Sequence, residues 1–192
     1  MKYLVLAVAV CFLAGCAQQV YLKKSPSEMV LTSIKSDNNK KVSYTFKSNI
    51  PDTLVLRGFQ FDVNATYQSN LRIYMNTKYS VVENDSTNIE FELLSCNQTV
   101  RNANSGLQNT SNVLNALAGG NSQMYNNIVL TTEIDLKVTI KNGTNTLAEK
   151  KIFTTDEYNG DNNNANIAAS SFDQAIGKSI IMIDKFVSSI QN

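Results

Sequence analysis

The longest regular pattern in this chain is an alternation of apolar and polar positions in its second half. From residue 128 to residue 140 every second residue is apolar, except that Thr132 takes one of the apolar places. Such alternation is typical of a long strand with one face on a hydrophobic core, as in antiparallel sheets. Asn142-Gly143 follows, and because both residues tolerate positive φ, the pair predicts a type I′ hairpin turn. Residues 146–158 then return as the partner strand.

Shorter runs predict further strands in the first half of the chain. Residues 42–47 alternate Val, Tyr and Phe with Ser, Thr and Lys, which is the period-two pattern of a half-buried strand. We expect additional strands at residues 53–61 and 79–82. A longer strand from residue 88 to about residue 99 includes Cys96.

Two stretches have helical spacing. Asn64 is a favoured N-cap, because its side-chain oxygen can accept from backbone amides of a first helical turn, and a helix of residues 65–78 is predicted after it. A second helix is predicted from about Ala165 to Ile190, where apolar residues recur at steps of three and four. Together these elements indicate an α+β fold. Its antiparallel sheet has a long hairpin and is covered by a C-terminal amphipathic helix and a second, shorter helix.

The first fifteen residues have the pattern of a removable export signal. Lys2 supplies a positive charge, and residues 3–13 form an apolar run of about eleven residues, shorter than the roughly 20 that a spanning helix needs. Leu-Ala-Gly-Cys at residues 13–16 resembles the lipobox of bacterial lipoproteins. That resemblance implies cleavage between Gly15 and Cys16 and a lipid on the Cys16 sulfur. The alternative is an ordinary signal peptide in which Cys16 has no special role.

A lipid on Cys16 would decide where the protein resides. One acyl chain holds a protein only marginally at a bilayer, whereas two or more hold it persistently. Residue 17 is Ala rather than Asp, and in sorting of the enterobacterial type this implies release to the periplasmic face of the outer membrane.

The sequence therefore divides into three parts. Residues 1–15 form the signal peptide, residues 16–36 form a lipidated tether with one short strand near residues 20–22, and residues 37–192 form a single periplasmic domain. Residues 102–123 are rich in Asn, Ser and Gly, with one apolar island at Val113, Leu114 and Leu117. We interpret this stretch as a loop between strands. The alternative is an amphipathic turn on a membrane or partner.

Composition excludes several classes of function. After loss of Lys2 the mature chain has equal numbers of basic and acidic side chains, so charge gives no reason to expect nucleic acid as a partner. Histidine is absent, which excludes a Ser-His-Asp triad, a Cys-His dyad and a histidine-ligated zinc site. Cys96 has no partner in the mature chain and is expected to be a buried thiol. No catalytic residue, metal site or cofactor is predicted.

Several acidic residues are grouped in a way that could serve acid–base catalysis or cation binding. Glu90 and Glu92 lie two apart on one strand, as do Glu133 and Asp135, and paired carboxylates can share a proton in acid–base catalysis. A solvated strand face explains both pairs better. Residues 156, 157 and 161 are acidic as well, but their spacing lacks the alternating ligands and the glycine of a calcium loop.

One motif suggests a modification. Residues 62–66 read Asp-Val-Asn-Ala-Thr, which matches the extended acceptor sequence of bacterial periplasmic N-glycosylation systems similar to that of Campylobacter. Asn64, the expected helix cap, is thus also a possible glycosylation site in a host that has the enzyme.

The order of elements resembles that of small bacterial outer-membrane lipoproteins of the YajG type. The resemblance rests on the lipobox, on the helix and strands of residues 71–96, on the hairpin of residues 134–158 and on the C-terminal helix. It implies location and fold, and it carries no catalytic residues. We therefore expect a non-enzymatic envelope lipoprotein that binds or stabilises another envelope component. The alternative, from a more distant likeness, is an auxiliary lipoprotein of a lipid-trafficking or ABC-type transport system.

Overall fold

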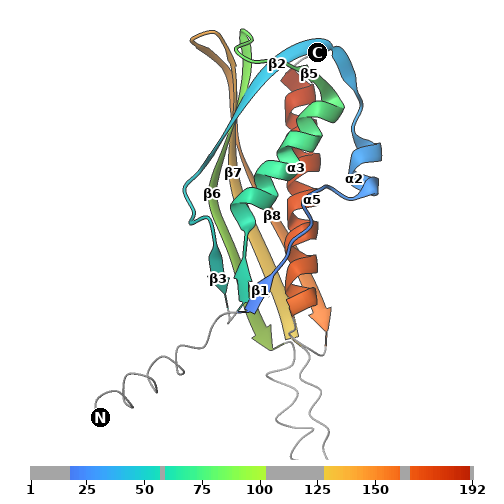
Figure 1. The fold of residues 1–192 in the computed structure, drawn as a ribbon, viewed down its shortest axis with the longest axis vertical. Coiled ribbons are helices and arrows are strands. Elements are labelled where there is room, and N and C mark those ends of the chain that lie inside the picture. The colour runs from blue at the N-terminus through green and yellow to red at the C-terminus, as the bar shows by residue number, and fades with distance from the viewer. Residues whose placement is uncertain (1–17, 57–58, 103–127, 161–164, 191–192) are drawn as a thin grey trace, which may run out of the picture.

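The computed structural model describes residues 18–56, 59–102, 128–160 and 165–190 (Figure 1). Its main part is one layer of sheet with helices packed on one face, so the predicted α+β class is confirmed. The elements follow the order β1 (Gln18–Val20), α2 (Glu28–Ser33), β2 (Asp37–Ser48), β3 (Leu54–Leu56), β4 (Phe59–Phe61), α3 (Val63–Lys78), β5 (Tyr79–Val81), β6 (Thr87–Asn102), β7 (Ile128–Asn142), β8 (Asn145–Gly160) and α5 (Ala165–Ile190).

The main sheet has the strand order β5-β2-β6-β7-β8. Strands β6, β7 and β8 are antiparallel, as the alternation predicts, whereas β2 is parallel to both of its neighbours. The sheet is thus mixed rather than wholly antiparallel. Parallel neighbours need a long crossover, and α3 provides it between β2 and β5. A half-buried strand has the same alternation in either arrangement, which is why the direction of β2 was not predicted.

A second, smaller sheet lies at the end where the described chain begins, called here the lower end (Figure 1). It has the order β1-β4-β3, with β1 parallel and β3 antiparallel to β4. The single strand expected at residues 53–61 is therefore two short strands.

The start of the described chain belongs to the folded domain. Val20, Leu22, Val30 and Ile34 are all buried in the main hydrophobic core. A core position is incompatible with a free tether, because burying these side chains requires a defined backbone path. Residues 18–34 are thus part of the domain, and the predicted domain start at residue 37 is too late.

The β7-β8 hairpin confirms the strongest sequence prediction. All seven inward positions from Ile128 to Ile140 are buried, including Thr132. The turn differs from the predicted type I′ turn: Asn142 pairs with Asn145, so Gly143 and Thr144 are its central residues. Gly143 has a φ of 58°, and Asn142 does not have positive φ. Positive φ at the first central residue alone is the pattern of a type II′ turn.

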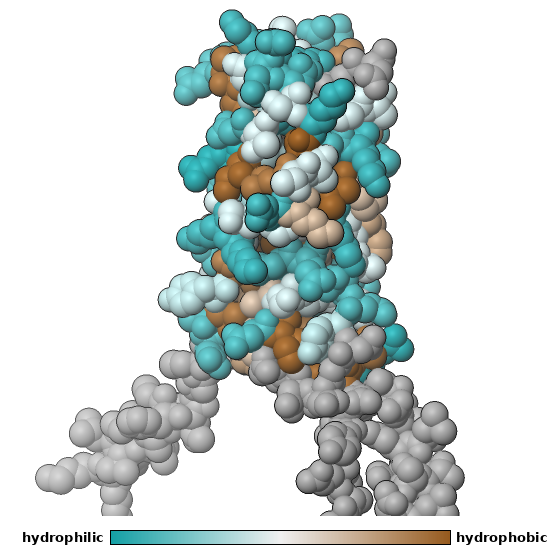
Figure 2. All heavy atoms as spheres, turned by 90° about the vertical axis from the view of Figure 1, so that its right-hand side faces the viewer, coloured by the Kyte–Doolittle hydropathy of each residue, from teal (hydrophilic) through white to brown (hydrophobic). Residues whose placement is uncertain are grey.

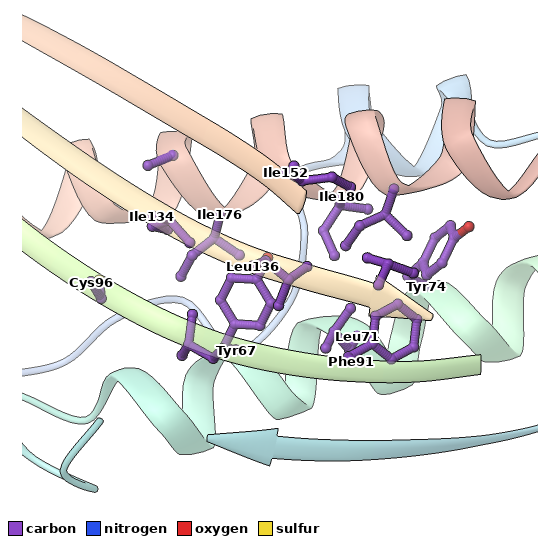
Figure 3. Packing of buried hydrophobic residues seen from close by; sticks show 14 of the residues in the cluster. Tyr67, Leu71, Tyr74, Phe91, Cys96, Ile134, Leu136, Ile152, Ile176 and Ile180 are labelled. Carbon is purple, nitrogen blue, oxygen red and sulfur yellow. The ribbon is translucent and has the colours of Figure 1, made fainter. Parts of the chain in front are cut away.

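Helices α3 and α5 cover the inner face of the main sheet. The predicted face of α3 is confirmed, since Tyr67, Leu71, Tyr74 and Met75 are all fully buried. Figure 3 shows Tyr67, Leu71 and Tyr74 of α3 in one continuous core with side chains of β7 and α5, which are Ile134, Leu136, Ile176 and Ile180. The α5 stripe is confirmed over most of its length, although Ile167 is half-buried and Ile190 is exposed.

Two predictions fall wholly or largely outside the described residues. The signal peptide and Cys16 precede Gln18, and most of the Asn/Ser-rich stretch lies between Asn102 and Ile128. Within the described part of the chain, no helix combines the length and apolar character needed to span a membrane.

Candidate functional site

The predicted lipid site lies close in sequence to the smaller sheet. Gly15 and Cys16 are outside the described residues, so cleavage and lipidation there stay predictions. Strand β1 begins at Gln18, two residues after Cys16, and pairs with β4 at the lower end of the molecule (Figure 1).

Asn64 has a structural role that differs from the predicted one. It is the second residue of α3, whose N-cap is Asp62, so the prediction of Asn64 as N-cap is wrong. Its amide nitrogen donates to Ile50 O at 3.0 Å and to Asp52 Oδ1 at 3.2 Å, and its oxygen accepts from Ser48 Oγ at 2.6 Å. The side chain ties the end of β2 to the start of α3, and only 9% of Asn64 is exposed. Glycosylation stays a prediction. A glycan on this nitrogen replaces one of its two hydrogens, so at least one of the two donated bonds would be lost.

Glu90 and Glu92, one of the two carboxylate pairs, have separate partners in the structure. Glu90 accepts from Lys141 Nζ at 2.8 Å, and Glu92 accepts from Asn49 Nδ2 at 3.0 Å, so each has its own partner on the outer face of the sheet. Asp156 turns inward under α5 while Glu157 remains outside. Among the described residues, no three acidic or thiol side chains group in a way that would hold a metal ion.

A polar cluster interrupts the core between the sheet and the first half of α5. We call it the lower polar cluster; its members are Gln98, Thr132, Asp156, Ser171 and Lys178. Gln98 Nε2 donates to Thr132 Oγ1 at 2.9 Å, and Thr132 Oγ1 shares a 2.7 Å hydrogen bond with Ser171 Oγ. Ser171 Oγ and Lys178 Nζ both donate to the Asp156 carboxylate, at 3.2 and 2.8 Å. Every member has a partner, as buried polar groups require, so the cluster fixes the position of α5 on the sheet.

A second polar cluster joins α3 to the last turns of α5. This upper polar cluster consists of Tyr74, Lys78, Asp184 and Ser188. Lys78 Nζ donates to Asp184 Oδ1 at 2.6 Å and to Ser188 Oγ at 2.9 Å, and the Tyr74 hydroxyl donates to Asp184 at 3.3 Å. Burial, followed by the neighbouring Asp184 charge, raises the pKa of Tyr74. The hydroxyl therefore stays protonated and acts as a donor.

Cys96 is a buried structural thiol, as predicted. It lies in β6 among core residues, and burial raises its pKa to about 12. A thiol that stays protonated is a poor nucleophile.

A groove lies between the α2 segment and α5. It has a volume of about 340 Å³ and is lined by side chains that include Lys23, Met29, Asp173 and Ile181. Asp173 accepts from the Lys23 backbone amide at 2.9 Å, and burial raises the pKa of its carboxyl. Helix α2 approaches α5 closely because residue 177 is glycine: an added Cβ would lie 3.3 Å from Val30 Cγ2.

A smaller hollow lies on the other flank of α5, beside β8. It has a volume of about 270 Å³ and shares Lys178 and Ile181 with the α2–α5 groove; the other lining residues are Phe153, Thr154, Thr155 and Met182. Phe153 is 56% exposed and Met182 is 36% exposed. Figure 2 shows the side of the molecule that carries α2 and α5, where apolar side chains gather in separate patches between polar ones.

Sequence reasoning did not find this flank of α5. One signal was available: Phe153 follows Ile152, so a large aromatic residue stands at an outward position of β8. Met182 likewise lies outside the apolar stripe of α5. Neither residue is needed for the core, and only the tertiary structure brings the two together.

The comparisons with known proteins show a shared fold. No family model matches the chain, and no curated protein is significantly similar in sequence. A solved structure of a Xanthomonas campestris protein of the DUF330 family model has a TM-score of 0.53 at 10% identity, over 91% of this chain and 97% of that one. This likeness extends over nearly the whole of both chains, and at such low identity it shows the fold alone.

Two other solved structures are titled as lipoproteins. The rare lipoprotein B of Shewanella oneidensis has a TM-score of 0.45 at 11% identity, over 78% of this chain and 99% of that one. A minor lipoprotein of Acinetobacter baumannii has a TM-score of 0.44 at 12% identity, over 79% of this chain and 94% of that one.

Proposed function

We propose that this protein is a bacterial envelope lipoprotein of the YajG type. Its α+β domain is anchored by a lipid on Cys16 and binds or steadies another envelope component without catalysing a reaction. The observation that carries the proposal is the sequence Leu-Ala-Gly-Cys at the end of a short apolar run with a charged start.

The position of β1 supports a close attachment to the bilayer. Two peptide units separate Cys16 from Gln18. Because an extended chain spans at most about 3.6 Å per residue, these two residues lie at most roughly 7 Å apart. The lower end of the domain, where β1 pairs with β4, would therefore lie at the lipid surface. The opposite end, with the last turns of α5, would point away from it (Figure 1).

The polar groups of the domain support a non-enzymatic role. The chain has no histidine, Glu90 is paired with Lys141, and Asp156 is held by Ser171 and Lys178. These carboxylates already have hydrogen-bond and ion-pair partners within the fold, which supports a structural use of them.

Metabolic labelling with radioactive palmitate tests the anchor. The wild-type chain, expressed in a bacterium, should incorporate label and sediment with membranes, and Cys16→Ser should abolish both. Cys96→Ser is the matched control, because it makes the same atomic change at a buried thiol and should leave labelling intact. Labelling that persists in Cys16→Ser, or a wild-type chain that is unlabelled and freely soluble, contradicts the proposal.

The outer-membrane location is tested on the same labelled protein. Wild-type chain should band with outer membranes on a density gradient, and Ala17→Asp should move it to inner membranes. A wild-type chain in the inner-membrane fraction would refute this part of the proposal. Crosslinking in cells then identifies the bound component, and a single dominant ABC-transporter subunit would favour the transport alternative.

A further inference from the structure

The proposed function leaves open how the domain holds another envelope component, and strand β8 offers a specific answer. It is sixteen residues long and pairs only with β7 among the described strands, so it forms one edge of the main sheet. The opposite edge is β5, which has only three residues. A long edge strand presents a row of unpaired backbone amides and carbonyls, to which another extended chain can add.

A contact at Thr155 shows which backbone groups face the free edge. Lys178 Nζ donates to Thr155 O at 3.0 Å, so this carbonyl points toward the side chain of α5 rather than into the β7 ladder. In an antiparallel ladder, residues two apart direct their backbone groups to the same side. The amides and carbonyls of Lys151 and Phe153 therefore face the same open edge, and Lys178 caps its lower part.

The apolar hollow lies where the alternate side chains of an added strand would project. A strand beside β8 directs every second side chain toward the α5 side of the sheet, where Ile181 and Met182 line the hollow with Thr154. It would also pass beside Phe153, which lines the same hollow and is more than half exposed. Backbone pairing would supply affinity, and the hollow would select apolar side chains at alternate positions.

The charges around this edge favour an acidic segment. Lys151 and Lys185 are exposed, and Lys178 is 52% exposed. The nearby acidic side chains already have basic partners: Glu149 pairs with Lys137, Glu157 with Arg101, and Asp156 with Lys178 itself. Lys151 and Lys185 supply further positive charge among the described residues. The charge that an incoming strand meets is therefore mainly positive.

The same charges disfavour a second copy of this chain. In an antiparallel β8–β8 pair centred on Phe153, Lys151 of one copy would lie opposite Thr155 of the other. Lys178 already contacts that Thr155 carbonyl. The ammonium groups of Lys151 from one copy and Lys178 from the other would therefore lie close together at each end of the pair, which is unfavourable.

We propose that the β8 edge and the hollow between Phe153 and Met182 bind an extended, acidic segment of a partner protein with apolar side chains at alternate positions. The segment pairs with Glu149 to Phe153 and ends where Lys178 caps Thr155. This inference rests on the proposed function for its biological setting only, because the geometry lies in the folded domain and does not involve Cys16.

Fluorescence anisotropy with a labelled octapeptide of alternating Glu and Val tests the proposal. The protein is the unlipidated mature chain, residues 16–192 with Cys16→Ser, which retains every described residue. We expect saturable binding that weakens about tenfold or more in Met182→Glu, because the hollow then repels the acidic peptide. Lys47→Gln lowers the net charge by the same one unit on β2, remote from β8, and should leave the affinity unchanged. Far-UV circular dichroism confirms that each variant is folded.

Three results would overturn the proposal. One is the absence of saturable binding, and another is equal binding of a peptide whose alternate amides are methylated, since backbone pairing would then not be used. The third is competition by dioleoylphosphatidylglycerol vesicles that is lost in Met182→Glu, which would assign the hollow to acyl chains. Because the protein here carries no lipid, any of these outcomes leaves the palmitate experiment, and hence the anchor, unaffected.

Discussion

Two lysine–aspartate pairs lie against α5, and they are built in opposite ways. In the upper polar cluster Lys78 is the buried partner, with 4% of its side chain exposed against 18% for Asp184. In the lower polar cluster Asp156 is buried, with 5% of its side chain exposed against 52% for Lys178. One pair joins two helices, and the other joins a helix to an edge strand.

The contrast indicates which residue of each pair is sensitive to substitution. A buried charge that loses its partner cannot be hydrated, so removing the accessible partner destabilises strongly. Removing the buried charge leaves an accessible group that water can solvate. Each buried charge then keeps one hydrogen bond, Lys78 with Ser188 and Asp156 with Ser171. The exposure of the removed partner therefore decides between the clusters: the side chain of Asp184 is 18% exposed and that of Lys178 is 52% exposed.

The largest effect is expected at the upper pair. Asp184→Ala leaves the Lys78 ammonium buried and should lower the free energy of unfolding by about 3–5 kcal/mol. Lys78→Met removes the buried charge and keeps most of the side-chain volume, so its loss should be less than half as large. Urea unfolding of the unlipidated mature chain, followed by circular dichroism, measures both. Equal losses in the two variants would mean that burial of Lys78 does not control the stability of this pair.

In the lower pair, too, removing the accessible partner should cost more free energy of unfolding than removing the buried charge, but both losses should be smaller. Lys178→Met leaves Asp156 with the Ser171 hydroxyl as a hydrogen-bond donor and should lower the free energy of unfolding by about 1–2 kcal/mol, because Lys178 is partly hydrated. Asp156→Asn removes the buried charge and keeps an acceptor, so it should be the milder change. The same urea titration tests this, and a larger loss in Asp156→Asn would refute the comparison.

The centre of the lower polar cluster should be less sensitive than its charged end. Thr132→Val removes one hydroxyl, and both of its partners keep a second hydrogen bond, Gln98 to Ala168 O and Ser171 to Asp156. We expect a loss of about 1 kcal/mol. Thr131→Val is the matched control on the opposite face of β7 and should be neutral. If Thr132→Val lowers the free energy of unfolding more than Lys178→Met does, the stability of the network depends on its central hydroxyls rather than on its charged end.

The smallest effect is expected for an ion pair on the outer face of the sheet. Lys137 Nζ lies 2.9 Å from Glu149 Oε2, and this contact raises the pKa of Lys137 and lowers that of Glu149. Both groups are solvated, so Lys137→Met should leave the urea midpoint at pH 7 unchanged within error. A clear shift of the midpoint would show that exposure does not predict how much an ion pair contributes to stability, including the two pairs that lie against α5.

The local patterns predicted the elements well where one face alone is buried. The alternation around Ile134 and Leu136 and the helical spacing around Tyr67 and Leu71 reflect a single apolar face, and such faces repeat with the period of their element. The buried Thr132 fits the same period, but its hydrogen bonds to β6 and α5 have no sequence signal. Each partner is more than thirty residues away along the chain.

The predictions that differ from the structure involve choices between near-equal local alternatives. Asp62 and Asn64 are both acceptable residues at the start of a helix, and tertiary hydrogen bonds to Ile50 and Asp52 place Asn64 inside it. Val20, Leu22 and Val30 are too few to predict more than one short strand, so their burial in the core was not predicted. Their positions depend on surfaces that α5 and β4 supply.

The amino-acid sequence by itself determined the strands of the long hairpin, the two main helices and the absence of histidine chemistry, because periodicity and composition are local properties. Only the tertiary structure decided that β2 runs parallel to β6, that one polar cluster buries a lysine and the other an aspartate, and that β8 forms an open edge beside Phe153 and Met182. Those features arise where segments distant in the chain meet. The free energy of such contacts depends on burial and geometry that no single segment contains.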